Sequence, residues 1–344
     1  MNTWGNFLAE NRTADVTRVR APGRVNLIGD HTDYTGGLVL PMTIDRWTEI
    51  TFRPDPRVVL TSDDEDLAAD LDVFQADPMS VEPAWARFVA GVIAEMGPAE
   101  GIRGHITTSI PIGAGLSSSA ALEIAVAIAL GHDGDPISLA QLCQRAEHRA
   151  CGVPSGIMDQ LVIAAGRAGH ALLIDCGELS VEAVPMPPEA EIVVQFVAHR
   201  TLAGSPYADR VAQCAAAESI IGPLRLATPT DVHRIDDPLI RSRARHVVSE
   251  NQRVRDFAAA FAAGDLAAAG ALMVESHESL AADYATSTNE MDAAVRLAKG
   301  RPGVYGSRMT GGGFGGCIVS LCEPGTQIDG WVVTAVDGAG LATP

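Results

Sequence analysis

Residues 23–41 read GRVNLIGDHTDYTGGLVLP, and the interpretation of the whole chain starts from this stretch. An apolar run ends at Gly29, and a second apolar run begins after two further glycines. Two strands joined as a hairpin need only a short polar turn between them. Here residues 30–34 carry two carboxylates, an imidazole and a phenol, and Arg24 lies just upstream. So many functional groups in one tight turn favour a binding site, with a solvated loop as the alternative.

The overall composition excludes several classes of protein. The chain has 344 residues, 47% of them hydrophobic, and a net charge of −18. This length suits one large domain or two ordinary ones. A nucleic-acid-binding protein usually presents a basic face, so no nucleic-acid partner is expected, and the acidic run 62–72 is predicted to be solvated surface. The longest apolar stretch contains Glu123 and is too short to span a bilayer, so no membrane contact is expected.

The cysteines and the N-terminus bear on the cellular compartment. The six cysteines include no CxxC pair. In a chain this long they are expected to be reduced, mostly buried thiols, which predicts a cytoplasmic protein. Residues 1–16 lack a basic segment followed by an apolar core, so they are not expected to be a signal peptide.

Lysine is almost absent from the chain. Of the 25 basic residues 24 are arginine, and Lys299 is the single lysine. A Walker A loop and a protein kinase each need a lysine at the nucleotide phosphates. Any phosphate chemistry must therefore rely on backbone N–H groups, helix N-termini, arginines or a metal ion.

Hydrophobic patterns predict mixed secondary structure in the first half. Strands are expected at 17–29, 37–54 and 104–111, from β-branched content and alternation. Three helices should follow. The first has a serine cluster able to cap its start and Gly131 at its end, and it is apolar nearly all round, so it should be buried. The second has Ser138 as N-cap and Gly152 as stop, and the third starts with Asp159 near its first turn.

The second half is predicted to start after a shift in composition near 178–190. A strand at 191–198 should be followed mostly by helices over 207–299, and then by strands at the C-terminal end. Alternation of both element types predicts two α/β or α+β domains.

Two glycine-rich segments indicate close approach of backbone to a ligand. In PIGAGLSSSAAL (111–122), glycines and serines lead into a helix N-terminus, whose free N–H groups and partial positive charge suit a phosphate. An ordinary serine-capped helix is the alternative. In MTGGGFGGC (309–317), five of the six residues 311–316 are glycine. One turn does not need so many glycines, and each costs about 0.5–1 kcal/mol of folding free energy relative to alanine. We therefore expect a bulky ligand or the first glycine loop to lie close to this backbone.

Two carboxylates further along could take part in phosphoryl transfer. Asp159 follows a Pro-Ser-Gly turn at a helix start. It could be a base or an electrostatic partner in phosphoryl transfer, or simply a carboxylate stabilised by the helix dipole. Glu147 read alone is a surface residue or a partner of Arg145 or Arg149. The turn at 30–34 suits a sugar, because carboxylates and imidazoles can bridge adjacent hydroxyls.

These segments, in this order, resemble the galactokinase branch of the GHMP small-molecule kinase superfamily. APGRVNLIGDHTDY resembles the galactokinase signature, PIGAGLSSSAALE the ATP-binding motif, and RMTGGGFGGC the C-terminal glycine motif. AEHRACGVPSGIMDQ, HALLIDC, RTLAGSPYADR and ARHVVSE also follow the galactokinase pattern. The likeness runs over nearly the whole chain.

The resemblance implies an α+β fold of two GHMP kinase domains with the active site in the cleft between them. Residues 1–180 would form a ribosomal-protein-S5-like α/β domain that carries the sugar turn and the ATP phosphate loop. Residues 181–344 would form a ferredoxin-like α+β domain with the second glycine-rich loop. The chain would act as a monomer.

The resemblance also assigns roles to residues. Asp159 and Arg24 match the catalytic pair, while Ser119 and Glu147 match the Mg²⁺ positions, which replaces the surface interpretation of Glu147. Sugar contacts are implied for Asp30, His31, Thr32, Asp33, Gly156, Asp159 and Tyr207. ATP contacts are implied for Gly113, Ala114, Gly115, Leu116, Ser117, Ser118, Ser119 and, from a less specific match, Trp85.

The implied reaction is phosphorylation of galactose at its C1 hydroxyl by MgATP, giving α-galactose 1-phosphate and ADP, the first committed step of the Leloir pathway. The sequence departs from the family at Asp30, where Glu is usual and contacts the C6 side of the sugar, and at Gly177, where Arg is usual. The alternatives are a GHMP kinase for an arabinose-like or C6-modified sugar, and a non-catalytic sugar and ATP sensor, which usually lacks part of the serine loop or catalytic pair.

Overall fold

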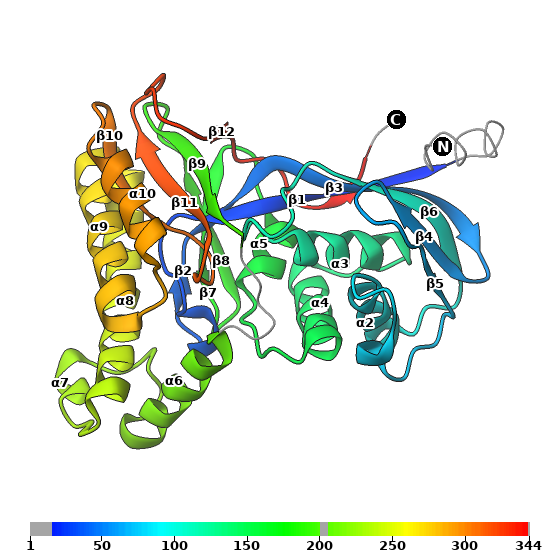
Figure 1. The fold of residues 1–344 in the computed structure, drawn as a ribbon, viewed down its shortest axis with the longest axis horizontal. Helices are drawn as coiled ribbons and strands as arrows, with labels where there is room; N and C mark the ends of the chain where they lie inside the picture. Colours follow the sequence, from blue (N-terminus) through cyan, green and yellow to red (C-terminus); the bar gives the residue numbers. More distant parts are fainter. Residues whose placement is uncertain (1–15, 200–205, 343–344) are drawn as a thin grey trace.

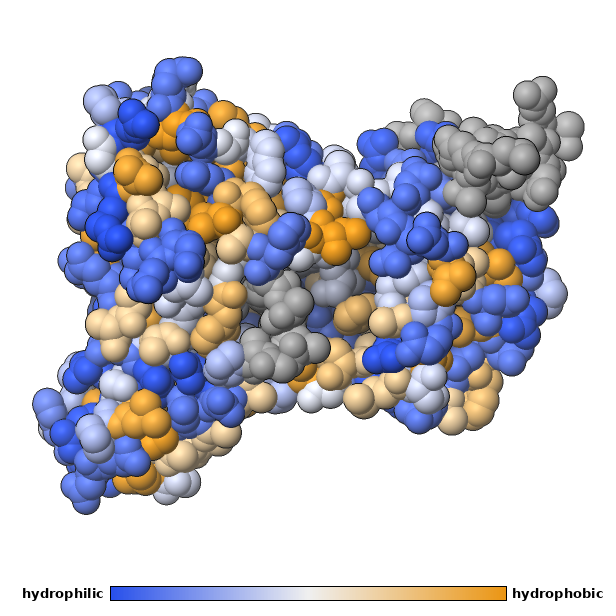
Figure 2. Space-filling model, in the orientation of Figure 1, coloured by the Kyte–Doolittle hydropathy of each residue, from blue (hydrophilic) through white to orange (hydrophobic). Residues whose placement is uncertain are grey.

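A computed structural model describes residues 16–199 and 206–342. Among these residues the chain forms three sheets and a set of helices arranged as two lobes (Figure 1). In the space-filling view the molecule narrows between the lobe that carries the largest sheet and the lobe that carries the longest helix (Figure 2). The predicted α+β class is confirmed.

The larger lobe is built on a six-stranded sheet in the order β13-β1-β3-β6-β4-β5. All of its pairs are antiparallel except β4 with β6. A smaller sheet, β2-β7-β8, continues from the same region. The strands of these two sheets are β1 (Thr17–Asn26), β2 (Leu38–Val39), β3 (Pro41–Asp55), β4 (Val58–Ser62), β5 (Ala69–Leu71), β6 (Gly101–Thr108), β7 (His170–Asp175), β8 (Ser180–Pro185) and β13 (Gly340–Leu341).

Four helices pack together beneath the large sheet (Figure 1). They are α2 (Ala86–Met96), α3 (Ser118–Ala129), α4 (Pro136–Cys151) and α5 (Met158–Ala165). As predicted, α3 is buried nearly all round, and even Glu123 is fully inaccessible. The strands and helices expected in this half are confirmed, and the exposed acids 63–66 confirm the solvated acidic run.

Two predicted helix caps are wrong. The N-cap of α4 is Asp135, three residues before the expected Ser138, because the carboxylate of Asp135 accepts hydrogen bonds from the N–H groups of Ile137 and Ser138. Helix α3 is preceded by Ser117 in a left-handed conformation (φ +64°). The hydroxyl of Ser117 makes no capping bond, because it donates to the carboxylate of Asp159 instead. The predicted end of α4 at Gly152 is confirmed.

The second lobe holds a four-stranded antiparallel sheet in the order β10-β11-β9-β12, with helices packed beside it (Figure 1). A π-helical turn follows α9 at Leu280–Tyr284. The elements are β9 (Glu191–Ala198), α6 (Tyr207–Ile221), α7 (Pro229–Val232), α8 (Pro238–Ala262), α9 (Leu266–Ser279), α10 (Asn289–Lys299), β10 (Val304–Met309), β11 (Gly316–Cys322) and β12 (Trp331–Val333).

The two lobes share one hydrophobic core. Buried residues of β1, β3 and α3 belong to the same cluster as buried residues of β9, β11, α8 and α9. A second cluster lies among α6, α8, α10 and the π-helical turn. The last strand, β13, returns to pair with β1 of the first lobe. The division of the chain at 180/181 stays a prediction, and the pairing of β13 with β1 connects the second half of the chain back to the first lobe.

Candidate active site

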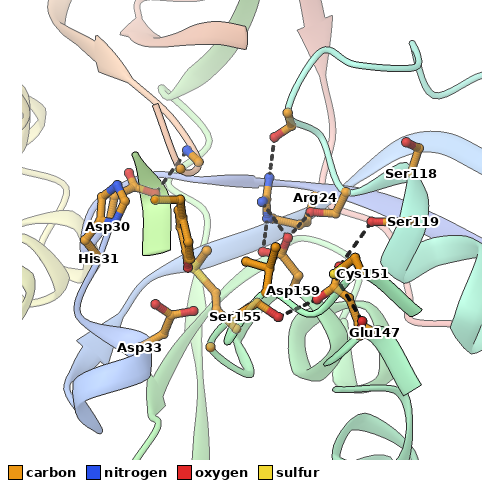
Figure 3. A pocket seen from close by; sticks show the side chains of 18 of the residues that line it. Arg24, Asp30, His31, Asp33, Ser118, Ser119, Glu147, Cys151, Ser155 and Asp159 are labelled. Carbon is orange, nitrogen blue, oxygen red and sulfur yellow. Dashed lines mark hydrogen bonds and ion pairs between the residues drawn. The ribbon is translucent and has the colours of Figure 1, made fainter. Parts of the chain in front are cut away.

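One pocket gathers residues that are far apart in the sequence, and Figure 3 shows their side chains converging. They come from β1, the turn at 30–34, the loop before α3, the end of α4, the start of α5, the start of α6 and the second glycine-rich loop. The predicted site residues that line this pocket are Arg24, Asp30, His31, Asp33, Gly113, Gly115, Ser117, Ser118, Ser119, Glu147, Gly156, Asp159 and Tyr207.

Arg24 and Asp159 form a bidentate ion pair on the wall of the pocket. The Nε and Nη2 groups of Arg24 donate to the two oxygens of Asp159 at 2.6 and 2.8 Å. The third arm of the guanidinium donates to the carbonyl of Gly115 at 2.7 Å. Burial alone would lower the pKa of Arg24, but Asp159 raises it, and the net shift is upward. The pair therefore presents a fixed cation and a fixed carboxylate side by side.

The backbone of β1 explains how Arg24 reaches this place. The register between β1 and β3 shifts between Pro22 and Gly23, which is an irregularity that re-aims side chains. A Cβ at Gly23 would lie 3.0 Å from the carbonyl of Leu116. The N–H of Arg24 donates to that same carbonyl at 3.2 Å. Close approach at the glycine thus holds the strand against the loop that precedes α3.

The phosphate loop, residues 113–119, is connected to the catalytic pair through Ser117. Its hydroxyl donates to Oδ2 of Asp159 at 2.5 Å. Ser117 makes this bond instead of capping helix α3. Gly113 and Gly115 have φ of +73° and +76°, so other residues would be strained there. Both glycines line the pocket.

The second glycine-rich loop approaches the phosphate loop, as predicted. Gly316 has φ +93°, and a Cβ there would lie 3.1 Å from the carbonyl oxygen of Ala114. Gly311 and Gly312 of the same loop line the pocket. The run of glycines therefore brings the two loops into backbone contact across the lobes.

Ser119 and Glu147 lie together on the opposite side of Asp159 from Asp30 and His31 (Figure 3). The hydroxyl of Ser119 donates to Oε1 of Glu147 at 3.3 Å. Glu147 is buried and does not pair with Arg145 or Arg149, which both bind Glu95. One carboxylate and one hydroxyl at a pocket wall suit Mg²⁺, which takes few protein ligands and completes its shell with water and phosphate. The donor set fits the predicted ion. The described residues hold no cluster of three or more His, Cys, Asp or Glu able to bind a metal.

The sugar turn, residues 30–34, places three of its predicted contacts on the pocket wall. Asp30 is almost fully buried; its Oδ2 lies 2.7 Å from Arg308 Nη1, and its Oδ1 accepts from the N–H of Gly311 at 3.0 Å. His31 has φ +66°, and its Nδ1 lies 3.0 Å from the hydroxyl of Tyr34. Its ring centroid is 5.4 Å from that of Tyr207. Both oxygens of Asp30 are thus already held by the second lobe.

Asp33 packs directly on Gly156. A Cβ at Gly156 would lie only 1.9 Å from Oδ2 of Asp33, so only glycine fits there. Burial, and after it the negative charge of Asp159, raises the pKa of the Asp33 carboxyl to about 7. The site therefore holds two carboxyl groups close together, and only the Asp159 carboxyl is bonded to Arg24.

Four predicted contacts do not reach this pocket. The hydroxyl of Thr32 donates to the carbonyls of Gly29 and Leu38 at 2.9 and 2.6 Å, so it holds the turn rather than facing the pocket. The side chains of Ala114 and Leu116 are buried behind the wall. Trp85 lines a neighbouring, mostly apolar pocket that also contacts Ser118 and Ser119. That position suits a flat apolar base beyond the phosphates.

Sequence reasoning missed several residues that build the site. They are Arg308, which is fully buried and holds Asp30 together with Gly311 of the predicted glycine run, and Ser155 and Gln160, which contact Glu147. The missed residues lie inside or beside the quoted motifs, but nothing in the sequence says which way their side chains point. At Gly177, the guanidinium of Arg225 fills the space where a Cβ would stand, 2.5 Å from its central carbon. Residues 200–205 of the RTLAGSPYADR motif lie outside the described residues.

Comparison with known proteins decides the family. The galactokinase galactose-binding signature matches residues 7–54, the GHMP kinase N-terminal domain matches residues 85–167, and the GHMP kinase C-terminal domain matches residues 257–329. Galactokinase from Chloroflexus aggregans is 45% identical over 95% of this chain and 89% of its own length. The chain belongs to the galactokinase family. It is accordingly a sugar kinase of the GHMP type.

Further relatives agree with this assignment. Human galactokinase is 44% identical over 89% of this chain and 83% of its own length. The crystal structure of Lactococcus lactis galactokinase complexed with galactose superposes with a TM-score of 0.89 at 30% identity, covering 98% of this chain and all of that one. A mevalonate kinase structure shares the fold with a TM-score of 0.64 at 18% identity. In the part of the chain that the structure describes, no helix is long and apolar enough to cross a membrane.

Proposed function

We propose that this galactokinase-family enzyme transfers the γ-phosphoryl group of MgATP to the C1 hydroxyl of galactose, giving α-galactose 1-phosphate and ADP. The observation that carries the proposal is the bidentate Arg24–Asp159 pair, which lies between the sugar turn and the phosphate loop in one pocket. The likeness to a galactokinase structure complexed with galactose supports the choice of sugar.

The nucleotide would lie along the phosphate loop. Free N–H groups at the N-terminus of α3 and the glycine backbone suit the phosphate oxygens. The single lysine, Lys299, is exposed at the end of α10 and supplies no charge to the pocket. Arg24 therefore supplies the cationic side chain at the transferring group, where positive charge stabilises the transition state.

Ser119 and Glu147 would hold the Mg²⁺ ion that accompanies ATP. The ion supplies charge neutralisation at the phosphates when bound. The protein's part is to keep the hydroxyl and the carboxylate adjacent at the pocket wall.

Asp159 would act on the sugar hydroxyl. Arg24 and Ser117 fix its carboxylate from two sides, so it faces the acceptor in one orientation. It orients the C1 hydroxyl or takes its proton as the phosphoryl group arrives. Asp30, His31, Asp33, Gly156 and Tyr207 would shape the cavity for the remaining hydroxyls.

We further propose that the enzyme is a cytoplasmic monomer. All six cysteines are unpaired, in keeping with a reducing compartment. Size-exclusion chromatography with light scattering tests the oligomeric state.

The test of the function is ADP release by the purified protein with MgATP across a panel of sugars: galactose, 2-deoxygalactose, galactosamine, arabinose, fucose, galacturonate and glucose. The proposal expects galactose to be preferred. Preference for a sugar altered at C6 would instead make Asp30, whose oxygens are held by Arg308 and Gly311, the residue that sets specificity. No turnover with any sugar would refute catalysis and favour a sensor.

A further inference from the structure

The two oxygens of the Glu147 carboxylate have different surroundings. Oε2 accepts hydrogen bonds from the hydroxyl of Ser155 at 2.5 Å and from the side-chain amide of Gln160 at 3.1 Å. Oε1 accepts only a long bond, 3.3 Å, from Ser119 among the described residues. Figure 3 shows Ser119 and Ser155 reaching toward Glu147 from two sides. One oxygen is thus occupied by the protein, and the other is shared with a residue of the phosphate loop.

The amide of Gln160 is oriented by two carboxyl groups. Its nitrogen lies 3.1 Å from Glu147 Oε2 and 3.4 Å from Glu123 Oε2, so each of its two hydrogens has an acceptor. The side chain is fully buried, and its own oxygen has no hydrogen-bond partner within 16–199 and 206–342. A buried amide that served packing alone would satisfy that oxygen, because leaving it unpaired costs free energy. The orientation observed instead favours the carboxylates.

Ser155 is itself anchored to the helix that carries Glu147. Its carbonyl accepts a hydrogen bond from the side-chain amide of Gln144 at 3.1 Å and lies 2.9 Å from Nε2 of His148. Both of these residues belong to α4. Because Ser155 immediately precedes Gly156, the same short segment touches the cation side and the sugar side of the pocket.

We propose that Ser155 and Gln160 are positioning residues that hold Glu147 by Oε2, so that Oε1 alone, beside Ser119, serves the divalent cation. The inference rests on the proposed function, and it says which residues orient the Glu147 carboxylate at the cation site. Outer residues that bind a metal-ligating carboxylate fix its direction, and their loss weakens metal binding by roughly 10- to 100-fold. A carboxylate freed at Oε2 could rotate away from Ser119, because the remaining bond at Oε1 is long.

The experiment measures cation binding directly. Mn²⁺, which prefers the same oxygen ligands as Mg²⁺, is titrated into the ADP complex of each protein, and free Mn²⁺ is read by electron paramagnetic resonance. The variants are Ser155→Ala and Gln160→Met. Gln252→Met is the matched control, because Gln252 donates to a carboxylate, Asp256, on the exposed face of α8. Differential scanning fluorimetry checks folding, and the half-exposed Ser155 keeps the test valid if the buried change unfolds the protein.

We expect roughly tenfold weaker Mn²⁺ binding for both site variants and no change for the control. Activity lost by the site variants should return at high Mg²⁺, while the KM for galactose stays unchanged. Wild-type Mn²⁺ affinity in both folded variants would overturn the inference. Failure of the proposed function looks different, since wild type itself would then release no ADP with any sugar.

Discussion

Replacing Asp33 by asparagine tests the electrostatics of the sugar turn. Burial, and after it the charge of Asp159, raises the pKa of the Asp33 carboxyl from 3.8 to about 7. The folded protein therefore holds this proton more tightly than the unfolded chain does. Stability from this group is fully present below pH 3.8 and is lost as the pH rises toward about 7. Asparagine cannot ionise, so the variant escapes that loss.

The size of the effect follows from the shift. One pKa unit corresponds to about 1.4 kcal/mol. The proposed measurements run from about pH 5.5 to about pH 8. Of this range, only the roughly 1.5 pH units below the raised pKa change the stability difference between the two proteins. The free energy of unfolding of Asp33→Asn relative to wild type should therefore rise by at most about 2 kcal/mol over the range. The figure is an upper bound because Asp33 is only half-buried at the pocket wall, where water screens its charge. For a chain of this length the change corresponds to a few degrees in Tm.

The assay is thermal unfolding followed by circular dichroism at several pH values in that range. Asp64→Asn, at an exposed acid of the run 62–72, controls for the loss of one negative charge. The gap between Asp33→Asn and wild type should widen as the pH rises, whereas the gap for the control should stay level. A pH-independent gap for Asp33→Asn would refute the reasoning. The same variant should bind galactose less well, because an amide replaces a carboxylate acceptor.

Three further substitutions test the geometry of the site. Asp159→Ala should fold and lose activity by roughly 10²–10⁴-fold in kcat, and wild-type turnover would remove Asp159 from the mechanism. Gly156→Ala should raise the KM for galactose at least tenfold without lowering kcat comparably, because the new Cβ would overlap the carboxyl of Asp33. Its control is Gly340→Ala, where a Cβ meets nothing within 4 Å. Equal KM values for the two variants would contradict the packing of Asp33 on Gly156. Gly316→Ala should cost about 1 kcal/mol or more, since its φ is +93° and it abuts the phosphate loop, and the KM for ATP should rise as well; an unchanged Tm and KM would show that the two loops need no such contact.

Local sequence predicted most of the secondary structure. Strand β9 was predicted at 191–198 and is found there, and α4 ends immediately before Gly152, as predicted. The predicted caps failed at Ser117 and Ser138 for a physical reason. Several nearby residues can supply a capping oxygen, and the tertiary structure selects among them. Asp135, about one turn earlier than Ser138, accepts the capping hydrogen bonds of α4, and the hydroxyl of Ser117 donates to Asp159 instead of capping α3.

The sequence by itself determined the chemistry available to this protein: arginine in place of lysine, two glycine-rich backbones, and acidic and imidazole groups in one turn. Their order along the chain was enough to indicate the family. Only the tertiary structure decided which atoms meet, because partners such as Arg24 and Asp159 are 135 residues apart. It also turned Asp30 toward Arg308, set Asp33 against Gly156, and gave the two oxygens of Glu147 different partners. Such pairings depend on how strands and helices pack across the two lobes, and no local pattern records that packing.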